Sequence, residues 1–294
     1  MKGKREKGPE WLLDPRGTRF YDVRQDGKLL LRVGSYHDPV VERPAGMSRF
    51  TSFLPAFSQQ VGEGQWGGII LDSTSSMNLS GRKWHQYQLN PDTSNQLQWY
   101  AGATDLAEEI LSCQLPALPC HVIAVFHVSR EKIEAEGTMH RQPFVPGKRL
   151  AESKSVAACF PELWYLYSTT TVEGKKVRLL QTDTDERYIA GTCVGIPDDM
   201  RVWKDTAKVW ETIIPLVRGP LHVALYGDPH TGKSTFARGL ALLKPPVYVA
   251  LFDGLGKDAC YRAMGGEVIE TEAQEAARKV LRLEHKKNGQ QKEA

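Results

Sequence analysis

The strongest constraint on the fold is a segment in the last third of the chain that matches the pattern GxxxxGK[ST]. Its residues are Gly227, Asp228, Pro229, His230, Thr231, Gly232, Lys233 and Ser234, and Thr235 follows them. An apolar run over 221–226 predicts a strand before this segment, and 235–243 predicts a helix after it. Backbone N–H groups of such a loop converge where the helix begins, which creates an anion site. The pattern therefore predicts a P-loop that binds a nucleoside triphosphate.

Each part of the motif has a predicted role. Residues 227–235 are expected to surround the phosphates, with Lys233 bridging the β- and γ-phosphates. The Ser234 hydroxyl is expected to ligate Mg²⁺, so ATP and Mg²⁺ are the predicted cofactors. The loop recognises phosphates, so the motif leaves the base open. An ordinary glycine turn is the alternative, and the flanking strand and helix favour the P-loop.

Hydrolysis requires an acid near the metal and a group that orients water. Three other apolar runs end in suitable residues: 67–72 ends at Asp72, 121–126 is followed by His127, and 247–252 is followed by Asp253. Asp72 fits a Walker B acid on the Mg²⁺ side, and His127 is the candidate that senses the γ-phosphate. The alternatives are a strand that merely ends in an Asp and a structural histidine at a strand end.

The alternation of short apolar runs with helical patterns predicts an α/β fold with a mainly parallel central sheet flanked by helices. Too few residues follow Ser234 to complete such a sheet, so the missing strands must precede the P-loop. The other expected elements are a hairpin with strands 18–23 and 28–33, a helix from Ser48 to Val61, a polar stretch over 73–95, a helix over 96–113, strands 163–168 and 176–182, and a helix over 206–217.

With these pieces reordered, the chain resembles RecA-like ATPases, and most closely the short recombination ATPases encoded by phages. The P-loop segment 226–235 resembles the first part of that family, and 249–258 resembles its next strand with an acid. Leu71-Asp72-Ser73 resembles Walker B, and Phe126-His127 resembles the polar-tipped strand. Pro146-Gly147-Lys148-Arg149 and Phe160-Pro161-Glu162-Leu163 resemble the segment after the mobile loop of the family.

The order of the motifs departs from the family, because Walker B precedes the P-loop here. The resemblance therefore implies a circularly permuted RecA-like P-loop NTPase with a β-hairpin extension, whose usual start lies near 200–203. The expected organisation is a flexible N-terminus (1–10), one ATPase domain (11–270) and a polar helical tail (271–294). Within the domain the Walker B half is 11–199 and the Walker A half is 200–270. The family often has a water-orienting Glu near the end of its second strand, so the resemblance implies this role for Asp253, and Asp258 is the next candidate.

The resemblance also implies a nucleic-acid partner. The DNA-binding loops of the family correspond to 73–95 and 129–158. The first contains cations and rings suited to phosphates and bases, namely Arg82, Lys83, Trp84, His85 and Tyr87. Basic residues of the second include Arg130, Lys132, His140, Arg141 and Lys154. The alternative for both is a solvated surface loop.

The implied function is a Mg²⁺-dependent ATPase that acts on single-stranded DNA in phage-type recombination or repair, as a homo-oligomer and with a single-strand annealing protein as a further partner. A basic residue from an adjacent subunit would complete the site in many relatives, and the candidates are Lys148, Arg149, Lys175 and Lys176. One rival is a P-loop kinase for small molecules or nucleotides, which would need a lid with several arginines. The other is a nucleotide-dependent binding switch with little turnover.

Composition narrows the setting. The net charge of +3 is small, so a surface that binds nucleic acid must be local. The five cysteines are scattered without metal-binding spacing, the N-terminus lacks the apolar stretch of a signal peptide, and no apolar run is long enough to cross a bilayer. We therefore expect no membrane association and a cytoplasmic location, in the host cytoplasm if a phage encodes the chain.

Overall fold

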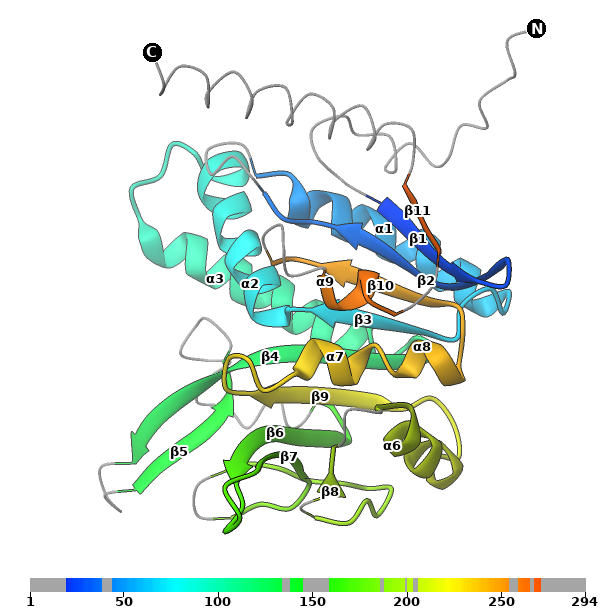
Figure 1. Cartoon of the computed structure of the whole chain (residues 1–294). Coiled ribbons are helices and arrows are strands. Elements are labelled where there is room, and N and C mark those ends of the chain that lie inside the picture. Colours follow the sequence, from blue (N-terminus) through cyan, green and yellow to red (C-terminus); the bar gives the residue numbers. More distant parts are fainter. Residues whose placement is uncertain are drawn as a thin grey trace, which may run out of the picture.

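A single mixed sheet organises the chain in the computed structural model (Figure 1). The structure describes residues 20–38, 44–133, 138–144, 159–185, 188–198, 200–202, 206–253, 259–264 and 267–270. Across the 11-stranded sheet the order is β11 (Glu267–Glu270), β1 (Phe20–Gln25), β2 (Lys28–Ser35), β10 (Val247–Leu251), β3 (Gly68–Asp72), β4 (His121–Ile133), β9 (His222–Gly227), β6 (Glu162–Thr170), β7 (Lys176–Gln181) and β8 (Met200–Arg201). β5 (Thr138–Pro143) lies off this path and pairs with β4.

The sheet is parallel only in its centre. The neighbouring strands from β2 to β6 run parallel, whereas β11, β1, β7 and β8 pair antiparallel at the two edges. The expectation of a mainly parallel sheet is therefore correct for the centre and wrong for the edges. Short turns, such as the one at Asp26-Gly27, connect neighbouring strands only in the antiparallel sense.

Strands that lie far apart in the sequence are neighbours in this sheet. β10 lies between β2 and β3, and β9 lies between β4 and β6. Every residue of β3 and β10 is buried, as expected for strands covered on both faces. The sheet therefore combines strands that follow the P-loop with strands that precede it, as the sequence predicts.

Two hydrophobic clusters cover the faces of the sheet. Four helical elements cover one face: α1 (Gly46–Gly62), α2 (Thr74–Trp84), α3 (Gln96–Glu109) and the π-helical turn Ile110–Gln114. Their buried side chains, among them Phe53 and Ile110, belong to one cluster with Tyr248. Four helices cover the other face: α6 (Thr206–Ile213), α7 (Lys233–Ala237), α8 (Leu240–Leu243) and α9 (Ala259–Arg262). Trp210 of α6 and Phe236 of α7 pack against Trp164 there. The helix that follows the P-loop therefore belongs to the second face.

Several expected helix boundaries differ from the observed ones. α1 does not begin at a Ser48 cap: its N-cap is Ala45, and Asp38 Oδ1 instead accepts hydrogen bonds from the N–H groups of Ala45 (2.9 Å) and Gly46 (2.7 Å). The expected helix 235–243 is two short helices, α7 and α8. Gly239 lies between them, and a Cβ there would crowd the Trp210 ring.

The polar stretch 73–95 is largely helical, which corrects the expectation of a loop. Ser73 caps α2 because its hydroxyl accepts a hydrogen bond from the Ser76 N–H (3.2 Å), and the π-helical turn His85–Leu89 continues the helix. In the second expected loop, 129–158, the described residues belong mainly to the hairpin of β4 and β5. The segments 1–10 and 271–294, together with 145–158, lie outside the described residues.

Within the described part of the chain, no helix has the length and apolar character required to cross a membrane.

Candidate functional site

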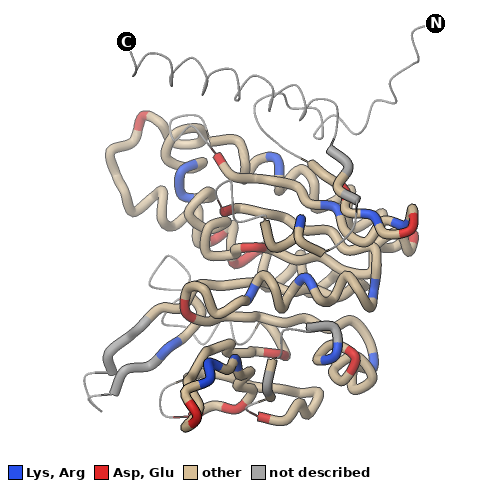
Figure 2. The backbone as a smooth tube through the Cα atoms, viewed as in Figure 1, with Lys and Arg blue, Asp and Glu red and all other residues tan. Residues whose placement is uncertain are grey.

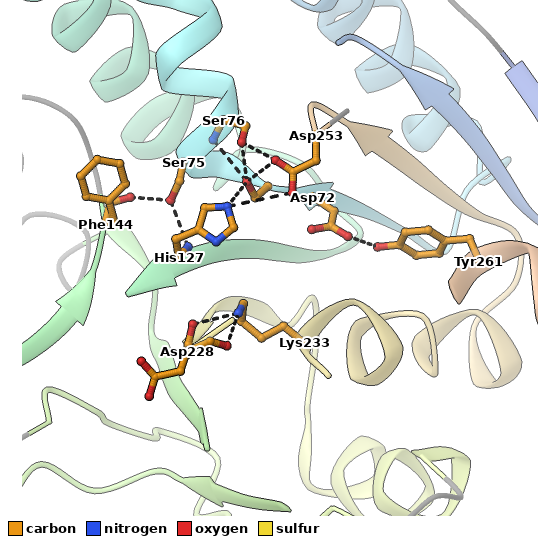
Figure 3. A network of polar contacts seen from close by, with 11 residues as sticks. Asp72, Ser75, Ser76, His127, Phe144, Asp228, Lys233, Asp253 and Tyr261 are labelled. Carbon is orange, nitrogen blue, oxygen red and sulfur yellow. Dashed lines mark hydrogen bonds and ion pairs between the residues drawn. The ribbon is translucent and has the colours of Figure 1, made fainter. Parts of the chain in front are cut away.

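The glycine loop joins the end of β9 to the start of α7 (Figure 3). A Cβ at Gly227 would overlap the carbonyl oxygen of Leu166 on the neighbouring strand β6, so only glycine fits there without moving a strand. His230 and Gly232 both have positive φ, 64° and 97°. Left-handed residues in such a turn orient successive N–H groups toward a shared concavity. The backbone therefore has the conformation that an anion-binding loop requires.

Lys233 is buried and is hydrogen-bonded within its own loop. Its Nζ donates to the carbonyl oxygens of Gly227 (2.8 Å) and Asp228 (2.9 Å). The Thr231 hydroxyl donates to the same Asp228 carbonyl (2.9 Å). The ammonium group is thus held at the loop, where a phosphate could replace these carbonyl partners.

Asp72 contacts the P-loop serine, although the two residues are far apart in sequence. The Ser234 hydroxyl lies near enough to the Asp72 carboxylate to lower its pKa, and Tyr261 Oη donates to Asp72 Oδ2 (2.8 Å). Burial raises the pKa of Asp72 above its usual value, and the nearby Asp253 carboxylate adds to this effect. The hydrogen bonds from Ser234 and Tyr261 and the charge of Lys233 act in the opposite direction. Burial therefore disfavours the charged form of this carboxyl group, and a cation beside it would favour that form.

Asp253 and His127 belong to a polar network at the same edge of the sheet (Figure 3). Asp253 accepts hydrogen bonds from the hydroxyls of Ser73 (3.2 Å) and Ser76. His127 Nε2 lies 3.3 Å from Ser73 Oγ and 4.0 Å from Asp253 Oδ2. In Figure 3, Asp228 and Lys233 lie opposite His127 and Asp72. The network links the ends of β10, β3 and β4.

The register of the strands explains this convergence. Asp72 pairs with Leu251 on one side and with Val125 on the other, and His127 pairs with Gly227. The carboxyl ends of parallel strands meet at one edge, where α/β proteins commonly bind ligands. The structure therefore brings together the sequence-predicted residues of this edge, namely Asp72, His127, Lys233, Ser234 and Asp253.

Ser73, Ser76 and Tyr261 are members of the network that the sequence reading did not identify. Ser73 directly follows the Walker B-like acid, and Ser76 lies in the first turn of α2. Both serines could have been predicted from the sequence if α2 had been expected to be a helix. Tyr261 lies on the short helix α9 and has no comparable signal in the sequence. Asp258, the second candidate to orient water, lies outside the described residues.

The residues present fit a magnesium ion that is held together with a nucleotide. Among the described residues, no group of three or more His, Cys, Asp or Glu side chains is placed to hold a metal ion. Mg²⁺ commonly binds through one or two protein oxygens with substrate phosphates and water as the other ligands. Ser234 and Asp72 offer such a pair, and the buried Asp72 carboxylate would be stabilised by the ion.

An aromatic cluster borders the other side of the loop. Tyr165 Oη donates to Asp228 Oδ2 (3.1 Å), and the Tyr165 ring stacks on Tyr188 with centroids 4.3 Å apart. Tyr167 stacks on Tyr165 at 5.7 Å. The Arg141 guanidinium lies 5.1 Å from the centre of the Tyr188 ring and donates to its hydroxyl (2.7 Å). These four residues, Arg141, Tyr165, Tyr167 and Tyr188, form what we call the tyrosine cluster.

The basic residues expected in a mobile first DNA-binding loop instead belong to packed helices. Arg82 donates to Tyr100 Oη (2.8 Å), and its guanidinium lies 5.4 Å from the centre of that ring. The His85 ring lies so close to Gly102 of α3 that a Cβ there would overlap it. Arg82 and His85 of the expected interface are therefore engaged in contacts with α3. Lys148 and Arg149 lie outside the described residues, and Lys175 and Lys176 are exposed beside the β6–β7 turn.

No protein family, no curated protein and no solved structure matches the chain.

Proposed function

We propose that this protein is a Mg²⁺-dependent ATPase with a circularly permuted RecA-like arrangement of its motifs. The observation that carries the proposal is the proximity of the Ser234 hydroxyl of the P-loop to the buried Asp72 carboxylate, whose pKa it lowers. These are the residues that a Walker A and a Walker B motif would place around a metal ion. Their contact is supported by neighbours of the expected kind, because Lys233 and Asp253 both influence the charge of Asp72.

The residues of the chain would divide the work as follows. Backbone N–H groups of residues 227–235 other than Pro229 bind the phosphates, and Lys233 exchanges its carbonyl partners for β- and γ-phosphate oxygens. Ser234 and Asp72 hold the metal, which when bound neutralises charge on the phosphates. Asp253 orients the attacking water, and His127 contacts the γ-phosphate. Ser73 and Ser76 position Asp253 through their hydrogen bonds.

Single-stranded DNA is the proposed second ligand, in a recombination or repair reaction. The support comes from the tyrosine cluster and the β4–β5 hairpin rather than from the first expected loop. Aromatic rings and arginine planes stack with nucleobases, and Arg141 supplies a positive charge. The cluster contacts the P-loop directly through the Tyr165–Asp228 hydrogen bond (3.1 Å). The Tyr165 ring itself is buried, so DNA would rest on the half-buried Tyr167 and Tyr188 and would influence the nucleotide loop through Tyr165.

A nucleotide-dependent binding switch is a second candidate. Asp253 has a shorter side chain than the Glu that is frequent in RecA-like ATPases, and it already accepts hydrogen bonds from Ser73 and Ser76. A carboxylate that is engaged in this way has less capacity to activate water. The switch would bind ATP and Mg²⁺ at the same residues but would turn over slowly.

ATP hydrolysis by the purified chain, with and without single-stranded DNA, tests the proposal. We expect turnover that rises with DNA and falls by about 10²–10³-fold in Lys233→Ala, since one preorganised charge at the transferring phosphate contributes on this scale. Lys208→Ala, an exposed lysine on α6, is the matched control and should keep full turnover. ATP binding without turnover would favour the switch, and phosphate transfer to an added acceptor would favour a kinase. Absence of ATP binding contradicts both the ATPase and the switch.

A further inference from the structure

Arg178 lies against the P-loop, although no motif points to it. It is an exposed residue of β7, where it pairs with Ser168 of β6. The position that a Cβ would take on Gly232 is 3.3 Å from Arg178 Nε and 3.6 Å from its Cδ and Cζ. The side chain therefore covers the glycine that immediately precedes Lys233.

The charge of Arg178 has no protein partner in the part of the chain that the structure describes. Neither an ion pair nor a side-chain hydrogen bond joins its guanidinium to a described residue. Lys176 adds positive charge on the same hairpin, where Lys175 is paired with Glu173 (3.0 Å), and Lys and Arg residues are blue in Figure 2. Lys233 follows Gly232 directly, so Arg178 and Lys233 bring two cationic residues to the same loop. Like charges at short range repel each other, and a bound anion would relieve this repulsion.

The sheet order indicates which part of a nucleotide Arg178 would meet. Asp72, His127 and Asp253 follow strands β3, β4 and β10, which all lie on one side of β9. β7 lies on the other side of β9, beyond β6. Arg178 therefore approaches the loop from the side opposite the proposed metal ligand Asp72 and the proposed γ-phosphate sensor His127.

We infer that Arg178 binds the α-phosphate end of the nucleotide within the same subunit. This inference rests on the proposed function, because it assigns one more residue to the same P-loop. A guanidinium suits this role since its planar donors match phosphate oxygens. Contacts at the α-phosphate are the same in ATP and ADP and do not change as the γ-phosphate leaves. Such contacts strengthen nucleotide binding without lowering the barrier of the bound state.

The test compares Arg178→Ala with the unchanged chain in Mg²⁺-dependent binding of ATP and of ADP, and in turnover at saturating ATP. We expect the dissociation constants of both nucleotides to rise by about tenfold, which corresponds to about 1.4 kcal/mol, while kcat changes by less than about twofold. Arg178→Lys should restore part of the affinity. Arg24→Ala, which removes a guanidinium from β1 at the far edge of the sheet, should change neither quantity.

Distinct outcomes would overturn the inference. Unchanged affinity for both nucleotides would exclude the contact, and a fall in kcat with unchanged affinity would place Arg178 at the γ-phosphate. Mixing Arg178→Ala with Lys233→Ala chains tests whether Arg178 acts within its own subunit. Turnover that recovers at subsaturating ATP would show that Arg178 serves a neighbouring subunit. If the unchanged chain and Lys233→Ala both fail to bind nucleotide, the proposed function fails, and the role of Arg178 fails with it.

Discussion

At the scale of single residues, the site is notable for a buried carboxylate that the nucleotide-free fold does not neutralise fully. Asp72 is only 4% exposed, and its partners Ser234 and Tyr261 are neutral hydrogen-bond donors. Buried charge without a close ion pair costs stability. Burial of Asp72 therefore costs the fold some stability, which is consistent with the proposed role of this carboxylate as a ligand for a cation.

The sign of the pKa shift of Asp72 gives a prediction about stability. The folded-state pKa is raised, so the folded state binds this proton more tightly than the unfolded chain, and its stability falls as pH rises above the unfolded value of about 3.9. Asp72→Asn removes the charge and keeps an acceptor for Tyr261. At pH 7 without Mg²⁺ we expect its melting temperature to rise by about 2–4 °C, which is on the order of 1 kcal/mol, while ATP turnover is lost.

The exposed Asp92 provides the control for this experiment. Asp92→Asn removes the same charge from the surface and should leave both the melting temperature and turnover unchanged. A lower melting temperature in Asp72→Asn would show that the carboxylate stabilises the nucleotide-free fold, contrary to our interpretation.

At the scale of elements, close strand packing determines where the P-loop begins. Gly227 ends β9 directly beside the Leu166 carbonyl of β6, so a methyl group there must separate the strands or distort the loop. We expect Gly227→Ala to lower the free energy of unfolding by roughly 2–4 kcal/mol, as overpacking against backbone does. In Gly62→Ala, at the end of α1, the added Cβ meets no atom within 4 Å.

Urea denaturation of the two variants provides the comparison. Gly62→Ala should be neutral or stabilising by up to about 1 kcal/mol, because alanine restricts the unfolded chain more than glycine does. Equal stability of Gly227→Ala and the unchanged chain would mean that the approach of β6 to β9 does not limit the loop.

The sequence predicts the strands of this site better than its helices and edges. The buried strands β3, β9 and β10 have continuous apolar runs that end in functional residues, so their pattern and their chemistry agree. α2 was not predicted because its inward face is polar: Thr74, Ser75 and Asn78 are buried there. Tyr261 could not be found either, because its contact with Asp72 depends on how α9 packs rather than on any local pattern.

At the scale of the whole molecule, the central claim is that motifs in a reversed order build one site. β3 carries Asp72 and β9 leads to Ser234, and β4 lies between these strands. The order of motifs along the chain is therefore independent of their order in space, as circular permutation allows when the former termini lie at the surface. In the proposed site, Asp72 and Ser234 hold the same metal ion.

The dependence of ATP affinity on Mg²⁺ tests this claim most directly. Titrations of the unchanged chain, Ser234→Ala and Asp72→Asn with ATP would be made with Mg²⁺ and with a chelator. We predict that Mg²⁺ strengthens ATP binding to the unchanged chain by at least about tenfold and that either substitution removes most of this gain. If both variants respond to Mg²⁺ as the unchanged chain does, Asp72 and Ser234 do not form a metal site, and the proposed arrangement is wrong.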